Sequence, residues 1–132
     1  MTSQFIEIKI LNMKFSFRAR LRSFGFAFMG FRTLLNSEHN ARIHLLATIL
    51  ALIAGFALKI SETEWALILI VIGMVWSAEA FNSAIEKLCD IITLEKNQSI
   101  KHIKDIAAFG VLITAFIAFV VGCLIFIPAI LK

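Results

Sequence analysis

The feature that most restricts the fold of this chain is a long apolar run near its C-terminus. From Ile106 to Leu131 the sequence contains no Asp, Glu, Lys or Arg. Roughly 20 apolar residues suffice to cross a bilayer, because a helix rises about 1.5 Å per residue and the hydrocarbon core is about 30 Å thick. The run is longer than that. The chain as a whole is 60% apolar, with a mean hydropathy of +0.90, so we expect an integral membrane protein.

Two earlier segments, residues 43–60 and 65–85, are also apolar enough to cross the membrane. Each carries only one formally charged residue. The stretch between them is so short that it predicts a tight helical hairpin, and Ser61 and Glu64 have the spacing of a capping box that opens the second helix. Together with residues 106–131, these segments predict three transmembrane helices in an all-α integral membrane fold.

The N-terminal segment, residues 1–37, has a different pattern. From Phe15 to Leu35, phenylalanine and leucine recur at helical spacing beside a face that carries arginines. This pattern predicts an amphipathic helix that lies on the membrane surface, with basic side chains toward anionic headgroups. Ser37 is expected to cap the helix that follows. The chain shows no internal repeat, so we expect residues 1–132 to form a single domain.

Basic residues before the first span indicate the orientation. By the positive-inside rule the N-terminus and the segment between the second and third spans face the cytoplasm, while the hairpin faces outward. The net charge of +4 is explained by anionic lipid, and no nucleic-acid partner is expected. The basic residues in question are Lys9, Lys14, Arg18, Arg20, Arg22, Arg32 and Arg42.

A polar stripe follows the second predicted span. Its members fall within roughly a third of the helix circumference at 100° per residue, and they are Glu79, Asn82, Ser83, Glu86 and Asp90. Glu79 is expected about 21 Å into the bilayer, and an ionisable group at that depth is a functional hypothesis by default. For Asp90 and Glu86, a solvated helix end is an equally good explanation.

The carboxylates of the stripe suit a magnesium ion. Glu79 and Glu86 lie on one helix face, and Glu38 is a third candidate. Magnesium takes a few carboxylate oxygens and completes its shell with water and nucleotide phosphates. Beside lipid, this combination indicates phosphoryl transfer with Mg²⁺ and ATP.

Two other functions remain open from the residues alone. A small transporter could use Glu79 as its coupling carboxylate, since intramembrane acids serve in that way. A noncatalytic membrane adaptor could bind lipid or a partner through the amphipathic segment, although that leaves the polar stripe unexplained.

The stripe also carries a resemblance to a known family. The residues Ala78-Glu79-Ala80-Phe81-Asn82-Ser83-Ala84-Ile85-Glu86, followed by Asp90 and Lys104-Asp105, resemble the prokaryotic diacylglycerol kinase and undecaprenol kinase family. The resemblance extends over nearly all of the chain from about Phe15. It implies an ATP-dependent lipid kinase of the bacterial inner membrane that works as a homotrimer, with active sites between subunits at the cytoplasmic face.

The resemblance also implies separate roles for site residues. Glu79 corresponds to the general base that takes the proton of the lipid hydroxyl, and Asn82 helps to position it. Glu38 and Glu86 correspond to the metal ligands. The residues implied at the nucleotide are Glu38, Glu86, Glu95, Asn97, Lys104 and Asp105.

Departures from the diacylglycerol kinase branch indicate the acceptor. That branch carries a Gln-Glu pair where this chain has Ile43-His44, and a serine near the lipid where this chain has Ala108. The segment Ser61-Glu62-Thr63-Glu64-Trp65 also resembles the undecaprenol kinase branch. We therefore expect undecaprenol, rather than diacylglycerol, as the lipid alcohol that is phosphorylated.

Overall fold

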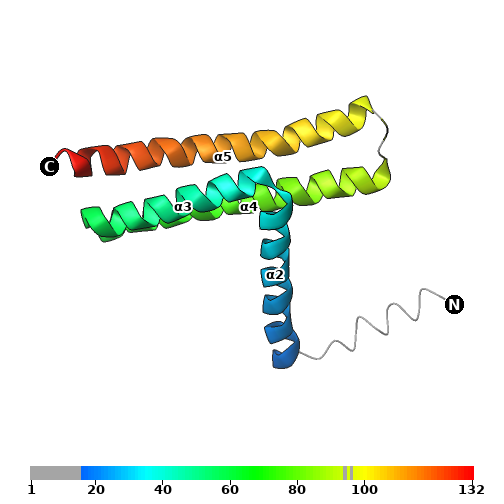
Figure 1. Cartoon of the computed structure of the whole chain (residues 1–132), viewed down its shortest axis with the longest axis horizontal. Coiled ribbons are helices and arrows are strands. Elements are labelled where there is room, and N and C mark those ends of the chain that lie inside the picture. Colours follow the sequence, from blue (N-terminus) through cyan, green and yellow to red (C-terminus); the bar gives the residue numbers. More distant parts are fainter. Residues whose placement is uncertain (1–15, 94, 96) are drawn as a thin grey trace. The chain divides into compact units, whose positions relative to one another are not determined.

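In the residues that its structure describes, the protein consists of α-helices joined by short turns. The computed structural model describes residues 16–93, 95 and 97–132, so the first part of the predicted surface segment, residues 1–15, lies outside the described residues. Figure 1 shows the four helices, and the described residues contain no strand. The helices are α2 (Phe17–Ser37), α3 (His39–Leu58), α4 (Glu62–Ile92) and α5 (Gln98–Ile130). The all-α prediction is confirmed.

The chain divides into two units, which meet between Thr33 and Leu34. The N-terminal unit holds most of α2. This helix opens with the Ser16 hydroxyl oxygen accepting a bond from the backbone N–H of Ala19, at 3.3 Å. Its phenylalanines, Phe24 and Phe28 among them, are exposed, as an amphipathic surface helix requires.

Three helices of the C-terminal unit are long and apolar enough to cross a membrane. All three extend beyond the predicted spans: α3 begins before residue 43, α4 continues past residue 85, and α5 begins well before residue 106. The extensions contain polar residues, so they were not part of the apolar runs from which the spans were predicted. The additional turns of α4 and α5 carry Glu86, Asp90, Lys104 and Asp105, whereas Glu38, Glu95 and Asn97 lie just outside the helices.

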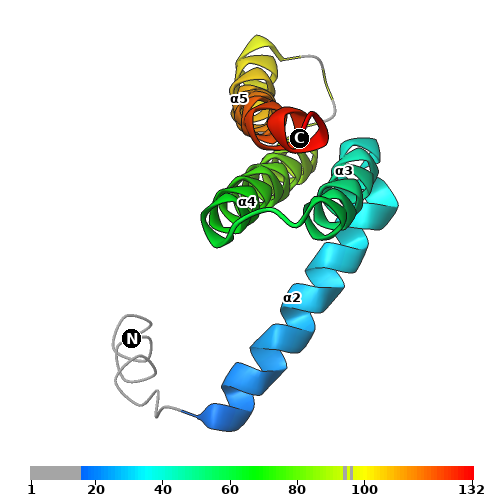
Figure 2. The same cartoon turned by 90° about the vertical axis from the view of Figure 1, so that its left-hand side faces the viewer.

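The hairpin between α3 and α4 is as predicted. Lys59 ends α3 in the left-handed conformation, with φ of 51°, and its N–H reaches the carbonyls of Gly55 and Phe56. Ser61 Oγ accepts from the Glu64 backbone N–H at 3.4 Å, while Glu64 Oε2 accepts from the Ser61 N–H at 2.7 Å. This confirms the capping box. Figure 2 views the bundle from the end that carries this hairpin and the C-terminus.

The prediction that Ser37 caps α3 is wrong. Ser37 is the last residue of α2, and Glu38 occupies the N-cap position of α3 with no side-chain capping bond. Ser37 Oγ instead donates to Glu38 Oε1 at 3.0 Å. The Arg42 guanidinium donates to the carbonyls of Leu35 and Asn36, both at 2.8 Å. It thereby satisfies acceptors that the end of α2 leaves without partners.

The core lies where the three spanning helices meet. α4 packs most extensively against α5, and α3 contacts both. Near the hairpin, Ile60, Ile68 and Ile125 form a buried cluster against which Trp65 packs. Gly55 allows α3 to approach this cluster closely, because a Cβ at that position would lie 2.8 Å from two ring carbons of Trp65.

We expect Gly55→Ala to destabilise the protein by about 1–3 kcal/mol, because the added methyl group overpacks the contact with the Trp65 ring. Thermal unfolding in detergent, followed by tryptophan fluorescence, measures the effect. Gly110→Ala is the matched control, since nothing lies within 4 Å of a Cβ at that site and alanine favours a helix more than glycine does. Equal unfolding temperatures for the two variants would contradict the packing role of Gly55.

Candidate active site

The polar stripe on α4 passes from the interior of the bundle to its surface. Glu79, Asn82 and Ser83 are buried, with exposed fractions of 1%, 8% and 4%. Glu86 is half-buried and Asp90 is exposed. The solvated-helix explanation therefore applies to Asp90, whereas the first three residues face other helices, where polar groups are costly without a partner or a ligand.

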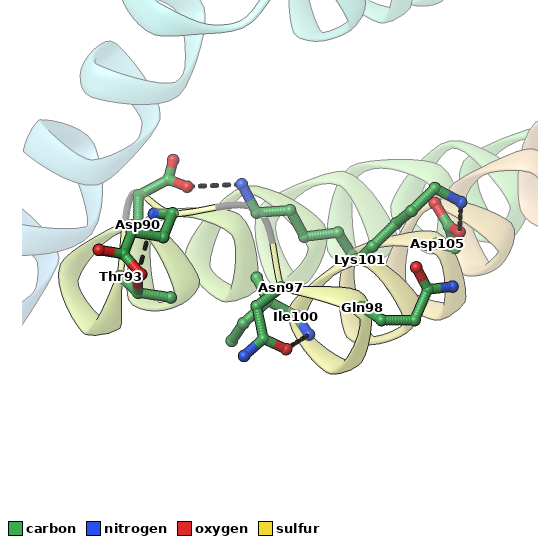
Figure 3. Close-up of a pocket in the computed structure, with 9 residues that line it drawn as sticks. Asp90, Thr93, Asn97, Gln98, Ile100, Lys101 and Asp105 are labelled. Carbon is green, nitrogen blue, oxygen red and sulfur yellow. Dashed lines mark hydrogen bonds and ion pairs between the residues drawn. The ribbon is translucent and has the colours of Figure 1, made fainter.

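At its exposed end, the stripe reaches a cleft beside the turn between α4 and α5 (Figure 3). The cleft has a volume of about 560 Å³. Its lining includes four of the predicted nucleotide-binding residues together with the last residue of the stripe: Glu95, Asn97, Lys104, Asp105 and Asp90. The remaining two, Glu38 and Glu86, do not line this cleft.

Ion pairs cross and flank the cleft. The Lys104 ammonium donates to Asp90 Oδ1, which joins α5 to the end of α4. Lys101 Nζ donates to Asp105 Oδ2 at 2.8 Å within α5. Asn97 has a structural role that the sequence analysis missed, since its Oδ1 accepts from the N–H of Ser99 at 2.8 Å and thus caps α5. An Asn just before a long helix was the available signal.

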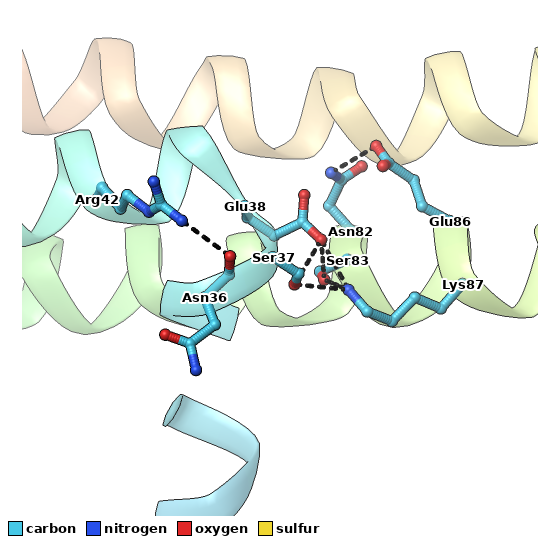
Figure 4. A network of polar contacts seen from close by, with 8 residues as sticks. All are labelled: Asn36, Ser37, Glu38, Arg42, Asn82, Ser83, Glu86 and Lys87. Carbon is cyan, nitrogen blue, oxygen red and sulfur yellow. Dashed lines mark hydrogen bonds and ion pairs between the residues drawn. The ribbon is translucent and has the colours of Figure 1, made fainter. Parts of the chain in front are cut away.

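Beside Ser83 of the stripe, Glu38 at the start of α3 is held by a lysine of α4 (Figure 4). Lys87 Nζ donates to Glu38 Oε1 at 2.7 Å, to Ser83 Oγ at 2.8 Å and to Ser37 Oγ at 3.1 Å. Ser83 Oγ donates to the same Glu38 oxygen at 3.1 Å. The hydrogen bond from Lys87 lowers the pKa of the Glu38 carboxyl below its usual value, with partial burial opposing and the two serines reinforcing the shift.

Lys87 is a second residue that the sequence analysis missed. It lies one helical turn after Ser83, so the i, i+4 spacing placed it beside the stripe. Its partner Glu38 is distant in the sequence, and no periodicity of α4 predicts that pairing. The cluster of Ser37, Glu38, Ser83 and Lys87 connects the junction of α2 and α3 to α4.

Glu86 belongs to the other side of the stripe. Its Oε1 accepts from Asn82 Nδ2 at 3.0 Å. Among the described residues, no group of three or more His, Cys, Asp or Glu side chains is arranged to hold a metal ion. The available ligands are nonetheless carboxylate and amide oxygens, which fit magnesium, because this ion is usually bound by one or two carboxylates plus substrate phosphates.

The innermost residue, Glu79, has an unsatisfied carboxylate. Its Oε2 is buried without a hydrogen-bond partner among the described residues, and the same is true of Asn82 Oδ1. His44 Nε2 of α3 lies 3.9 Å from Glu79 Oε2, which is too long for a hydrogen bond. Buried polar atoms without partners are rare in folded proteins, so these two oxygens mark a place where a ligand can supply the missing donor.

Asn82 and His44 also line a smaller cavity, whose lining does not include Glu79. It has a volume of about 290 Å³ and is bounded by α3, α4 and α5. Its polar lining comprises Asn40, His44, Asn82 and Glu86, and its apolar lining comprises Ile43, Ala108, Val111, Leu112 and Ala115. A cavity that is polar at one side and apolar at the other suits the end of an amphiphilic molecule.

Two comparisons of the sequence with known proteins show the family of the chain. A sequence model described as prokaryotic diacylglycerol kinase matches residues 25–126, which include all of α3 and α4. The chain is also similar to an undecaprenol kinase of Bacillus subtilis (strain 168), with 37% identity over 107 residues, which cover 81% of this chain and 87% of that relative. Every residue of the two cavities and of the Glu38 cluster lies within the range of the family match. The chain therefore belongs to the prokaryotic diacylglycerol kinase family.

Proposed function

We propose that this protein is a membrane lipid kinase that transfers the γ-phosphate of ATP to the hydroxyl of undecaprenol. Family membership, the undecaprenol kinase relative and the three apolar helices support it. The observation that carries the proposal is the unpartnered carboxylate oxygen of Glu79, which is buried in a helix long and apolar enough to span the membrane. A lipid hydroxyl can supply the donor that this oxygen lacks.

Glu79 is the general base. A lipid hydroxyl is a poor nucleophile until its proton is accepted by a nearby group. As the proton passes to the Glu79 carboxylate, the hydroxyl oxygen bonds to the γ-phosphorus. The bond from that phosphorus to the β-phosphate oxygen breaks, and ADP leaves. Asn82 orients the acceptor, because its Oδ1 is also buried without a partner beside the smaller cavity.

Glu38 and Glu86 would hold the magnesium ion that accompanies ATP. Glu86 belongs to the stripe and accepts a hydrogen bond from Asn82, and Glu38 accepts one from Ser83 of the stripe. When bound, the cation neutralises phosphate charge and so favours transfer. Lys87 forms an ion pair with Glu38, so Glu38 would be available to a cation only after Lys87 releases it.

The cleft at the turn between α4 and α5 receives the nucleotide. Lys104 neutralises phosphate oxygens after its ammonium leaves Asp90, and Asp105, Glu95 and Asn97 contact the remainder of the nucleotide. The cleft volume of about 560 Å³ falls within the usual range for small-molecule sites. The cleft lies at the polar end of α4, whereas Glu79 lies deeper, so water-soluble and lipid substrates approach from opposite sides.

The whole chain acts as one lipid-kinase domain in the bacterial inner membrane, with the N-terminus and the site at the cytoplasmic face. The arginines before the first span support this orientation. We also propose a homotrimer with sites shared between subunits. The spanning helices leave many large apolar side chains exposed, which lipid or neighbouring subunits can cover.

Purified protein in mixed micelles, given Mg²⁺ and γ-labelled ATP with equal amounts of undecaprenol and diacylglycerol, tests the proposal. We expect undecaprenol to be labelled about tenfold faster or more, a difference of about 1.4 kcal/mol in transition-state binding. Chelation with EDTA is expected to stop labelling, and added Mg²⁺ to restore it. Absence of label in both lipids with Mg²⁺ present would refute the kinase assignment, and faster labelling of diacylglycerol would refute the acceptor.

A further inference from the structure

His44 approaches the buried oxygen of Glu79 from the neighbouring helix α3. Its Nε2 lies 3.9 Å from Glu79 Oε2, and the two side chains are 15% and 2% exposed. A shift of about 1 Å by the imidazole ring brings this distance into hydrogen-bond range. Glu79 Oε2 has no hydrogen-bond partner among the described residues, and a carboxylate oxygen can accept two hydrogen bonds, so it can accept from His44 as well as from a substrate hydroxyl.

The backbone of His44 is anchored against α4 close to Glu79. Thr48 Oγ1 donates to the His44 carbonyl at 2.7 Å, and the indole N–H of Trp76 donates to Thr48 Oγ1 at 3.1 Å. Trp76 precedes Glu79 by less than one turn of α4. This chain of two hydrogen bonds fixes the height of the α3 backbone at His44 relative to Trp76 of α4.

His44 also lines the smaller cavity, together with Asn82 and Glu86. The opposite wall is apolar and includes Ala108 and Leu112 of α5. The cavity thus brings the imidazole to the place where an amphiphilic acceptor presents its hydroxyl. An aliphatic side chain at position 44 could fill the same space, but it would leave Glu79 Oε2 without any donor nearby.

We propose that His44 is a positioning residue for Glu79: as a neutral imidazole it donates its Nε2 hydrogen to Glu79 Oε2, and it thereby holds the carboxylate in the orientation in which it accepts the proton of the acceptor hydroxyl. This inference rests on the proposed role of Glu79 as the general base. The hydroxyl proton passes to Glu79, and His44 neither gains nor loses a proton. The arrangement requires the tautomer that carries hydrogen on Nε2.

The test compares donor-free and donor-retaining replacements. His44→Leu and His44→Phe remove the N–H, and both are expected to lower kcat by about 10- to 100-fold, because a misoriented base loses most of its effectiveness. The KM for ATP is expected to stay unchanged, because the nucleotide cleft does not include His44. His44→Gln retains an N–H donor and is expected to recover most of kcat. His39→Gln, at an exposed histidine of the same helix, is the matched control and is expected to keep wild-type kcat.

A double-mutant comparison separates positioning from a purely structural role. In a Glu79→Asp protein the shortened carboxylate is already out of reach, so adding His44→Leu is expected to cause little further loss. If the fold-losses in kcat of the two single variants multiply in the double variant, the proposal is overturned. Wild-type kcat in a folded His44→Leu or His44→Phe protein would also overturn it. So would a His44→Gln protein whose kcat is as low as that of these two variants. Full activity of Glu79→Gln would instead overturn the proposed function, so the two failures are distinguishable.

Discussion

Glu79→Gln is expected to lower turnover of the lipid substrate by about 10²- to 10⁴-fold, the usual contribution of a general base. Glutamine has nearly the same volume as glutamate, so the buried position on α4 stays filled. The amide cannot accept the hydroxyl proton, and this is the property that the variant removes. Single-turnover transfer of labelled phosphate measures the loss, and equilibrium binding of Mg²⁺-ATP to the same protein is expected to remain near the wild-type value.

Glu62→Gln is the matched control for this change. Glu62 lies in the first turn of the same helix, is exposed and belongs to the hairpin at the other end of the bundle. We expect wild-type turnover from it. Turnover by Glu79→Gln close to that of the control would show that another group accepts the proton. Loss of ATP binding together with turnover would show that Glu79 serves the nucleotide site.

Lys104→Met is expected to lower turnover by about 10²- to 10³-fold and to raise the KM for ATP. The reason is electrostatic, since the ammonium neutralises charge that develops on the transferred phosphoryl group. Methionine preserves most of the length and apolar volume of the lysine stem, so the packing of α5 is retained. Initial rates over a range of ATP concentrations separate the two effects, because a loss confined to KM indicates binding that is equal in the ground and transition states.

Lys101→Met is the control for Lys104. Lys101 lines the same cleft one turn earlier on α5, but its Nζ is committed to Asp105, and its side chain is 66% exposed. We expect a much smaller fall in turnover, since an exposed ion pair of this kind contributes little. Equal losses in the two variants would contradict a specific role for Lys104 and indicate a general effect of positive charge at the cleft.

Much of the fold follows from local patterns of the sequence. The three spanning helices were predicted because apolar runs near 20 residues have few alternatives to a membrane-spanning helix. The capping box at Ser61 was predicted because its bonds join residues only three positions apart. The stripe from Glu79 to Asp90 was predicted for the same reason, since helical periodicity alone places those side chains on one face.

The tertiary structure decided which of these side chains meet and which meet partners from elsewhere. Lys87 and Glu38 lie far apart in the sequence, as do His44 and Glu79, and no periodicity within one helix relates the members of either pair. Ser37 was misassigned as a cap because Glu38, held by α4, occupies the junction instead. Local spacing thus determined the helices and the face on which the acidic groups lie, because backbone geometry repeats along a helix. The pairing of those groups depended on helix packing, because distances between helices are set by side chains distributed over the whole chain.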